Sequence, residues 1–418
     1  MKNMRFSLLL ILLLSCSLLQ PITGQTRQTT ATINPDHITL SWTADPATSM
    51  TITWRTAASV DSGFVQYKTK TSHASEALTS EAQAHEFTTD LGTSKIFSAT
   101  LTGLIPDTEY MYQVGNSDRW SKKYSFKTSA TEINAFKFLV FGDSQSPVTG
   151  NNPYGVWRQT LHSAFEANPD AAFIINVGDL VDYGQSEAHW DAWFEASKGV
   201  IDTIPAMVIP GNHESYGMGK IGKPTFFVKQ FFLPQNGPAS LKNQVYSFDY
   251  GPVHIVMLDS QAVEQRNSGN IFSVQKPWLT SDLSSSNAIW KIASFHRAPY
   301  GVKPDRDESE LRNAFCPILE KYGVNLVFNG HDHGIKRTYP LKDGTPVENP
   351  LEGTTYYVTG HSGPKAYPDV EPMKYSAFFY ASPVQPNYLV VEGTNKEISV
   401  KIVLQDGRVI DTFTIEKP

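Results

Sequence analysis

The stretch AAFIINVGDLVDYG, residues 171–184, joins an apolar run to a short polar turn. The apolar residues are typical of a strand that is buried on both faces of a sheet. Asp179, Asp182 and Tyr183 follow within a turn that two glycines frame. Charged groups at the end of a buried strand are costly unless a partner compensates them, so the stretch predicts a compensated charge at a strand end.

The same pattern recurs along the second half of the chain, where further apolar runs end in polar residues. Helical stretches such as 154–167, 186–198 and 308–322 separate several of these runs. This alternation predicts a layered α/β core, whose ligands gather at the carboxyl ends of the strands. The runs are AFKFLVFGD (135–143), IPAMVIPGNHE (204–214), PVHIVMLDS (252–260), WKIASFHRAP (290–299) and VNLVFNGHDH (324–333).

Residues 31–128 contain seven short segments of alternating β formers, separated by turn signals. Their number and spacing predict a seven-stranded β-sandwich. TSATEIN, residues 128–134, is a linker in this interpretation, and the tail after the α/β segments is again rich in β formers. We therefore expect an all-β domain at 25–130, a catalytic domain at 131–365 and its β-rich C-terminal part at 366–418.

The first 24 residues have the pattern of a secretory signal peptide, with MKNMR, an apolar run and a turn-prone end at Gly24. We expect export to the periplasm or the medium and no membrane span after cleavage. LLSC ending at Cys16 also resembles a lipobox, so a lipoprotein and an uncleaved anchor are the alternatives. The formal net charge of −6 and the lack of a later Lys/Arg block indicate no nucleic-acid partner. Cys316 is then the one remaining cysteine, which predicts a buried thiol and no intrachain disulfide.

Polar residues with oxygen and imidazole donors follow the apolar runs. His331 and His333 lie two residues apart, so in an extended segment both point to the same side. Such donors suit transition-metal ions, and one carboxylate can bridge two of them. The candidate residues are Asp143, Asp179, Asn212, His213, His296, His331 and His333.

The ordered motifs GD, GD, GNHE, H and GHDH resemble the signature of the calcineurin-like metallophosphoesterases. PDHITLSWTADPATSMTITWRT, residues 35–56, is similar to the N-terminal domain of purple acid phosphatases, and LTGLIPDTEYMYQV, residues 101–114, resembles a fibronectin type III strand. The resemblance implies a fibronectin III-like sandwich followed by a four-layer α/β/β/α domain with a dinuclear metal site of Fe, Mn or Zn.

Carried over by position, the resemblance implies two sets of ligands that share one residue. Asp143, Asp179 and His333 would hold the first metal. Asn212, His296 and His331 would hold the second, with Asp179 bridging both. His213 would lie beside the metals, where it binds a phosphate oxygen or protonates the leaving group. Glu214 and Asp332 would orient imidazoles, with a solvated Asp332 as the alternative.

The first-metal site departs from the family pattern at two positions. Asp182 occupies the place where purple acid phosphatases have an iron-binding tyrosine, and Tyr183 follows one residue later. Gln145 stands where the wider superfamily often has a histidine ligand. The first metal site is therefore weaker, more open, or completed by Gln145, Tyr183 or water as a ligand. Asp182 is then a carboxylate outside the ligand set. We expect no tyrosinate-bound iron(III).

The family resemblance implies a phosphatase that hydrolyses phosphate monoesters by attack of a hydroxide generated on the metals. The substrate would be a small-molecule or protein phosphate ester. Arg297, Tyr300 and His361 are the candidates for substrate binding. A metal-dependent phosphodiesterase or nucleotidase stays open as an alternative, as does an inactive surface protein that binds metal or glycan.

Overall fold

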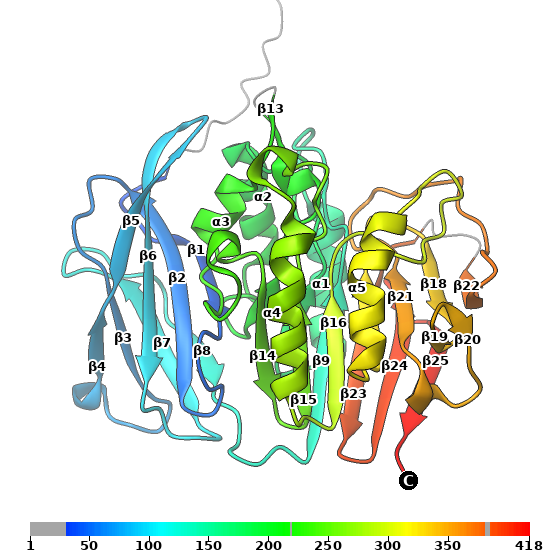
Figure 1. The fold of residues 1–418 in the computed structure, drawn as a ribbon. Coiled ribbons are helices and arrows are strands. Elements are labelled where there is room, and N and C mark those ends of the chain that lie inside the picture. Colours follow the sequence, from blue (N-terminus) through cyan, green and yellow to red (C-terminus); the bar gives the residue numbers. More distant parts are fainter. Residues whose placement is uncertain (1–30, 218–219, 381–384) are drawn as a thin grey trace, which may run out of the picture.

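The computed structural model describes residues 31–217, 220–380 and 385–418. The predicted signal peptide and the lipobox at Cys16 lie outside these residues. Among the helices of the described chain, none has the length and apolar character needed to cross a membrane. Figure 1 shows an N-terminal β-sandwich, in blue and cyan, beside a larger α/β part that contains the rest of the chain.

The N-terminal part is a sandwich of two four-stranded sheets. Eight strands form it instead of the predicted seven, because the prediction missed β4. The sequence of β4, LTSE, is mostly exposed at a sheet edge and has no apolar alternation. One sheet has the order β1 (Asp36–Ser41), β2 (Ser49–Ala57), β6 (Gly92–Thr102) and β5 (Gln83–Thr89). The other sheet has the order β4 (Leu78–Glu81), β3 (Phe64–Thr69), β7 (Glu109–Gly115) and β8 (Tyr124–Lys127).

The α/β part contains a six-stranded and a seven-stranded sheet. The C-terminal strands are divided between them, so this segment is built into both sheets. The six-stranded sheet has the order β11 (Ala206–Val208), β10 (Ile174–Asn176), β9 (Ala135–Phe141), β23 (Asn387–Thr394), β24 (Glu397–Leu404) and β25 (Val409–Glu416). The seven-stranded sheet has the order β14 (Tyr246–Tyr250), β15 (Val253–Met257), β16 (Trp290–Ser294), β17 (Leu326–Asn329), β21 (Thr355–Thr359), β18 (Ile335–Thr338) and β22 (Ser376–Tyr380).

Helices cover the outer faces of the two sheets, which gives the α/β/β/α layering. Along β15, Ile255 and Met257 belong to the large core between the sheets, whereas Val256 joins a second core under α4 and α5. This alternation is what a strand buried on both faces requires. The helices are α1 (Gly155–Ala167), α2 (Glu187–Ser197), α3 (Thr225–Gln230), α4 (Ile271–Ser285) and α5 (Ser309–Lys321); the short hairpins are β12 (Tyr216–Gly217) with β13 (Lys220–Ile221) and β19 (Leu341–Lys342) with β20 (Thr345–Pro346).

The parallel strands bring the polar strand ends to one edge of each sheet. β9, β10 and β11 are parallel neighbours in one sheet, and β15, β16, β17 and β21 are parallel neighbours in the other. Because parallel strands share the direction of their carboxyl ends, the residues that follow them gather together. The helix α5 also buries Cys316 as predicted, and burial raises the pKa of its thiol to about 12.

A buried ion cluster joins the sandwich to the α/β part. The Arg55 guanidinium on β2 donates to both carboxylate oxygens of Asp36 at 2.8 Å and also pairs with Glu187 and Asp191 of α2. His37 lies in the same cluster, 3.0 Å from Asp191. The grouping of His37, Glu187 and Asp191 has the donor types of a metal site. Its acids already have the Arg55 cation as a partner, so we assign the cluster a structural role.

Candidate metal centre and active site

The first group of candidate ligands comes from three strand ends in two sheets. Asp143 follows β9, Asp179 follows β10 and His333 follows β17. Their donor atoms lie within 4.8 Å of one another, and all three residues are buried. His333 Nε2 is 3.2 Å from Asp143 Oδ1, while its Nδ1 donates to the carbonyl oxygen of Lys365. The lone pair of Nε2 therefore faces the carboxylates.

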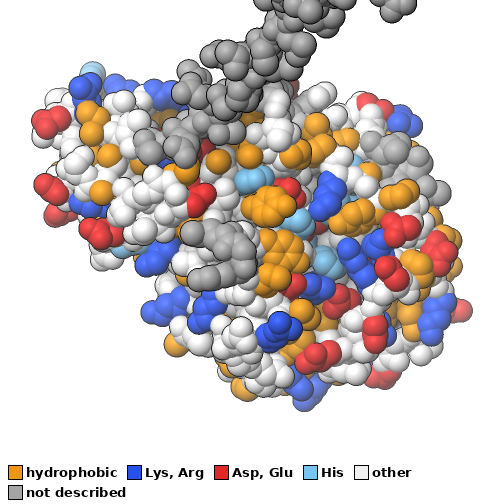
Figure 2. Space-filling model, turned by 90° about the horizontal axis from the view of Figure 1, so that it is seen from above, with side chains coloured by type: hydrophobic (Ala, Val, Ile, Leu, Met, Phe, Trp, Pro, Cys, Tyr) orange, Lys and Arg blue, Asp and Glu red, His pale blue; other side chains and the backbone are white. Residues whose placement is uncertain are grey.

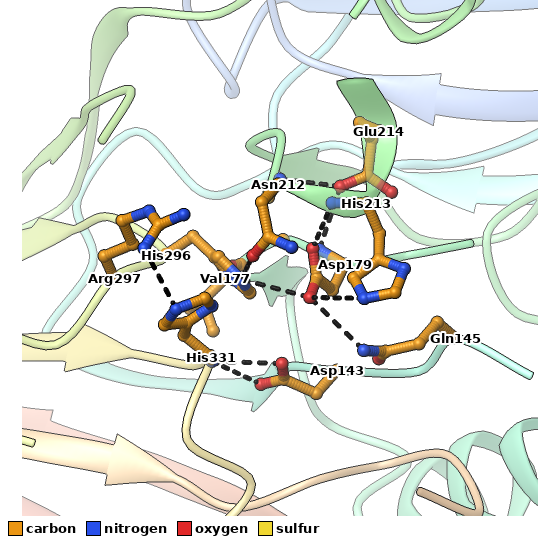
Figure 3. A network of polar contacts seen from close by, with 12 residues as sticks. Asp143, Gln145, Val177, Asp179, Asn212, His213, Glu214, His296, Arg297 and His331 are labelled. Atoms are coloured by element: carbon orange, nitrogen blue, oxygen red, sulfur yellow. Dashed lines mark hydrogen bonds and ion pairs between the residues drawn. The ribbon is translucent and has the colours of Figure 1, made fainter. Parts of the chain in front are cut away.

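The second group consists of Asp179, His296 and His331, again within 4.8 Å. His296 Nε2 lies 3.2 Å from Asp179 Oδ2 and 3.1 Å from Asn212 Oδ1. His296 Nδ1 donates to the Val177 carbonyl oxygen at 3.0 Å, which fixes the ring orientation (Figure 3). The structure thus brings together Asp143, Asp179, Asn212, His296, His331 and His333, the six residues predicted as ligands.

The surroundings of Asp179 and His331 favour the protonation states that ligands need, whereas at His296 the charge of Asp179 outweighs burial and raises the pKa. Burial alone would raise the pKa of Asp179, but His296 and His213 hold that pKa well below its usual range. Burial, followed by the charge of Arg297, lowers the pKa of His331 well below its ordinary value. A charged carboxylate and a neutral imidazole are the forms that coordinate metal ions.

Strained backbone positions concentrate at the same place. Asp143, Asp179, His331 and His333 all have positive φ, between 51° and 72°. This conformation is uncommon for residues other than glycine, and it persists only where the surrounding structure enforces it. Gly330 immediately before His331 has no room for a side chain, since a Cβ would lie 2.3 Å from Asp143 Oδ2. The turns are shaped to bring the ligand side chains together.

Gln145 lies at the first group. Its Nε2 atom is 3.2 Å from Asp179 Oδ2 and 3.2 Å from His333 Nε2, while its Oε1 atom is buried and has no hydrogen-bond partner. The amide oxygen and nitrogen have nearly the same shape, so a rotation of the amide would exchange them. With the amide turned in this way, the buried Oε1 would lie beside Asp179 and His333, which makes Gln145 an additional candidate ligand.

Two acidic residues support turns and not imidazole rings, which corrects the predicted roles of Glu214 and Asp332. Glu214 accepts from the backbone N–H groups of Asp179, Val181 and Gly211. Burial and the charge of Asp179 raise the pKa of Glu214 to about 7. Asp332 accepts from the backbone of residues 302 and 303 and from an Arg306 Nη1 atom at 2.7 Å. Both carboxylates therefore hold the loops that carry the ligands.

His213 and Asp182 form a pair beside the two groups. His213 Nδ1 donates to the Asp182 carbonyl oxygen at 2.7 Å and lies 3.3 Å from its carboxylate. Burial lowers the pKa of His213, but Asp179 and Asp182 raise it to about 9. Tyr183 is 51% exposed, and its ring packs against His189. No contact joins Tyr183 to a candidate ligand within the described part of the chain.

The three residues predicted to bind substrate occupy different surroundings. Arg297 donates to His331 Nε2 at 3.1 Å and pairs with Glu264 and Glu308. His361 is buried, and its ring lies parallel to that of His333 with centroids 6.2 Å apart. Tyr300 is buried in the second core, where it packs against Tyr356 and Tyr375; this position gives it packing contacts.

Sequence reasoning missed two residues that lie over the site. Lys365 contacts His333 through its carbonyl oxygen and places Nζ 3.4 Å from His213 Nε2. Tyr367 packs on the His333 ring with centroids 4.3 Å apart. Both belong to a loop after β21 that has no apolar periodicity. Only the GHSGP turn that precedes Lys365, after a strand end, indicated that this loop approaches the site.

Comparisons with known proteins agree with this fold and site. Residues 35–128 match the purple acid phosphatase N-terminal domain, and residues 136–334 match the calcineurin-like phosphoesterase family. The chain is a calcineurin-like metallophosphoesterase, a metal-dependent phosphoester hydrolase with a purple acid phosphatase N-terminal domain. The family implies a dinuclear metal centre, in line with the two clustered groups.

Individual relatives extend the similarity over most of the chain. Acid phosphatase type 7 of Mus musculus is 27% identical over 426 residues, covering 92% of each chain. Purple acid phosphatase 23 of Arabidopsis thaliana is 28% identical over 274 residues, 58% of this chain and 57% of that protein. The structure of a purple acid phosphatase from yellow lupin seeds has a TM-score of 0.77 at 20% identity, covering 92% of this chain and 74% of the lupin chain. At that identity the lupin structure supports the fold alone.

Proposed function

We propose that this protein is a phosphatase that hydrolyses phosphate monoesters with two bound metal ions, which are iron, manganese or zinc. One observation carries the proposal: the Asp179 carboxylate belongs both to the group with Asp143 and His333 and to the group with His296 and His331. A carboxylate in this position is suited to bridge two cations.

The residues present fit such a centre. Carboxylate, amide and imidazole donors suit these transition-metal ions. Buried carboxylates also need compensation, and the unpaired Oε1 atom of Gln145 is a further donor without a partner. We assign Asp143, Asp179, Gln145 and His333 to the first cation. Asp179, Asn212, His296 and His331 hold the second.

Bound at these residues, the two cations would polarise a phosphoryl group and lower the pKa of a coordinated water. The protein's own contribution is to position the substrate and to supply a proton. His213 Nε2 lies 3.9 Å from Asp179 Oδ2, at the edge of the ligand groups. From there it hydrogen-bonds a phosphate oxygen or protonates the leaving group. Arg297 is a further candidate for binding the substrate because it contacts His331.

The first cation is not a tyrosinate-bound iron(III) in this proposal. Asp182 lies at His213, and the half-exposed Tyr183 ring packs on His189. With iron confirmed by elemental analysis, the oxidised enzyme should show no visible tyrosinate band. A band that disappears in Tyr183→Phe would overturn this assignment.

A panel of phosphate esters tests the proposed activity. We expect the purified enzyme to hydrolyse an aryl phosphate monoester faster than its bis-aryl diester, to lose activity with a chelator and to regain it with metal. A diester that is cleaved faster would support the phosphodiesterase or nucleotidase alternative. Metal binding without turnover of any ester would support the inactive binding protein.

We also propose that the protein is exported, from the charged and apolar pattern of residues 1–24. Fractionation of cells that express the full chain should place the protein in the periplasm or the medium. A chain without residues 1–24 should stay inside. Incorporation of labelled fatty acid that is lost in Cys16→Ser would instead identify a lipoprotein, and a membrane-bound chain that keeps its first residues would identify an uncleaved anchor.

A further inference from the structure

The backbone around Lys365 is fixed to the loop that carries Asp143. The N–H of Ser362 donates to the Gly142 carbonyl oxygen at 2.8 Å. The N–H of Gly363 donates to the backbone carbonyl oxygen of Asp143 at 3.0 Å. A Cβ on Gly363 would lie 2.7 Å from the carbonyl oxygen of residue 144, so the two loops are in close contact. The carbonyl of Lys365 also accepts from His333 Nδ1. The main chain therefore holds this lysine at the site whatever its side chain does.

The Lys365 ammonium reaches His213 at the edge of the ligand groups. Its Nζ atom lies 3.4 Å from His213 Nε2 and 5.8 Å from the centre of the Tyr367 ring. Figure 2 shows histidines at the surface of this face, with basic, acidic and hydrophobic side chains around them. An anionic group bound next to His213 is therefore within reach of the lysine.

Lys365 differs from the other basic residues at the site because it has no acidic partner. Arg297 pairs with Glu264 and Glu308, Arg306 pairs with Asp332, and Lys303 pairs with Asp369. Across residues 31–217, 220–380 and 385–418, no carboxylate forms an ion pair with Lys365 within 4.0 Å. Its charge is thus not held in an ion pair, whereas Arg297, Arg306 and Lys303 each pair with at least one acid.

We propose that Lys365 binds a charged phosphoryl oxygen of the substrate and thereby sets a preference for monoesters over diesters. A monoester dianion has three non-bridging oxygens and two negative charges. A diester has two such oxygens and one charge, because the second ester group replaces the third oxygen. A cation that contacts the third oxygen gains a charge-assisted hydrogen bond only with the monoester. This inference rests on the proposed phosphatase function and adds the basis of its specificity.

The test compares Lys365→Met and Lys365→Arg with the wild type in the metal-loaded enzyme. Lys365→Met keeps the stem and the backbone contact with His333 but removes the charge. We expect its kcat/KM to fall about tenfold to a hundredfold on an aryl monoester, the size expected for a lost hydrogen bond to a charged group. The fall on the bis-aryl diester should stay within about threefold, and Lys365→Arg should recover most of the monoester rate.

Binding of inorganic phosphate gives a readout that does not depend on turnover. Its dissociation constant, measured by calorimetry, should rise about tenfold in Lys365→Met. Lys374→Met is the matched control, since Lys374 lies over the Tyr375 ring in the same loop and should leave both readouts unchanged. Metal content and circular dichroism confirm that each variant is folded and loaded.

Equal falls on both substrates, or an unchanged phosphate affinity in Lys365→Met, would overturn the role of Lys365. A wild type that hydrolyses no ester would refute the proposed function instead. In that case, weaker phosphate binding by Lys365→Met would still support the lysine contact.

Discussion

The Nδ1 atom of His213 lies 2.7 Å from the carbonyl oxygen of Asp182, so this nitrogen holds its proton and Nε2 is directed to the ligand groups. We predict that His213→Ala keeps its metal but loses about a hundredfold or more in kcat on an alkyl phosphate, as expected for a lost general acid. An aryl phosphate with a good leaving group should be affected much less. The exposed His73 provides the control His73→Ala. Full turnover of the alkyl phosphate by His213→Ala would exclude the acid role.

Gln145 should decide the affinity of one of the two metal sites. In Gln145→Leu, which keeps the size of the side chain and removes the amide, we expect one binding step to weaken by about tenfold or more while the other stays within about twofold. Calorimetric titration of the metal-free protein measures both steps. Gln66→Leu, at an amide in the sandwich that contacts Gln113, is the matched control. Two unchanged binding steps would show that Gln145 is not a ligand.

The Arg55 cluster should be a large contribution to stability at the junction of the two parts. Removing one partner of a buried ion cluster leaves unpaired buried charges, so Arg55→Met should lower the free energy of unfolding by about 3–5 kcal/mol. Chemical denaturation measures this loss. The exposed pair of Lys70 and Glu109 gives the control, because Lys70→Met should cost less than about 1 kcal/mol. Equal effects of the two substitutions would contradict the structural role of the cluster.

His254 should make stability depend on pH. Burial lowers its pKa, but hydrogen bonds with Asp249 and Asp282 raise it to about 9. A histidine whose pKa is higher in the folded than in the unfolded protein stabilises the fold through its charge. This stabilisation is complete below about pH 6.5 and is lost as pH rises through about 9. Because Asp249 is exposed and its charge is screened by solvent, we expect the charge of His254 to add only about 2 kcal/mol to the free energy of unfolding, less than the whole pKa shift would correspond to.

His254→Gln tests this dependence by thermal unfolding. The variant should be less stable than the wild type by about 2 kcal/mol at pH 6, and the difference should shrink by pH 10. A difference that is constant over this range, or that grows with pH, would show that the charge of His254 does not stabilise the fold.

The sequence predicts that the candidate ligands lie close together, because each of them follows a buried parallel strand. In such a sheet the position of Asp179 or His296 depends mainly on where its strand ends, which the apolar pattern marks. The exposed strand β4 has no apolar pattern and could not be found this way. The partners of Glu214 and Asp332 depend on the path of turns that carry no periodic signal. Lys365 lies in such a loop, and its missing acidic partner becomes visible only in three dimensions.

The central claim is that Asp179 joins two metal ions in one centre that hydrolyses phosphate esters. Asp179→Asn keeps the shape of the side chain and removes its charge. Metal analysis of the wild type and this variant after equilibrium dialysis, with activity on an aryl phosphate measured on the same samples, tests the claim most directly. We predict two metal ions per chain in the active wild type, and loss of metal together with activity in Asp179→Asn. A variant that retains two metal ions and full activity would contradict it.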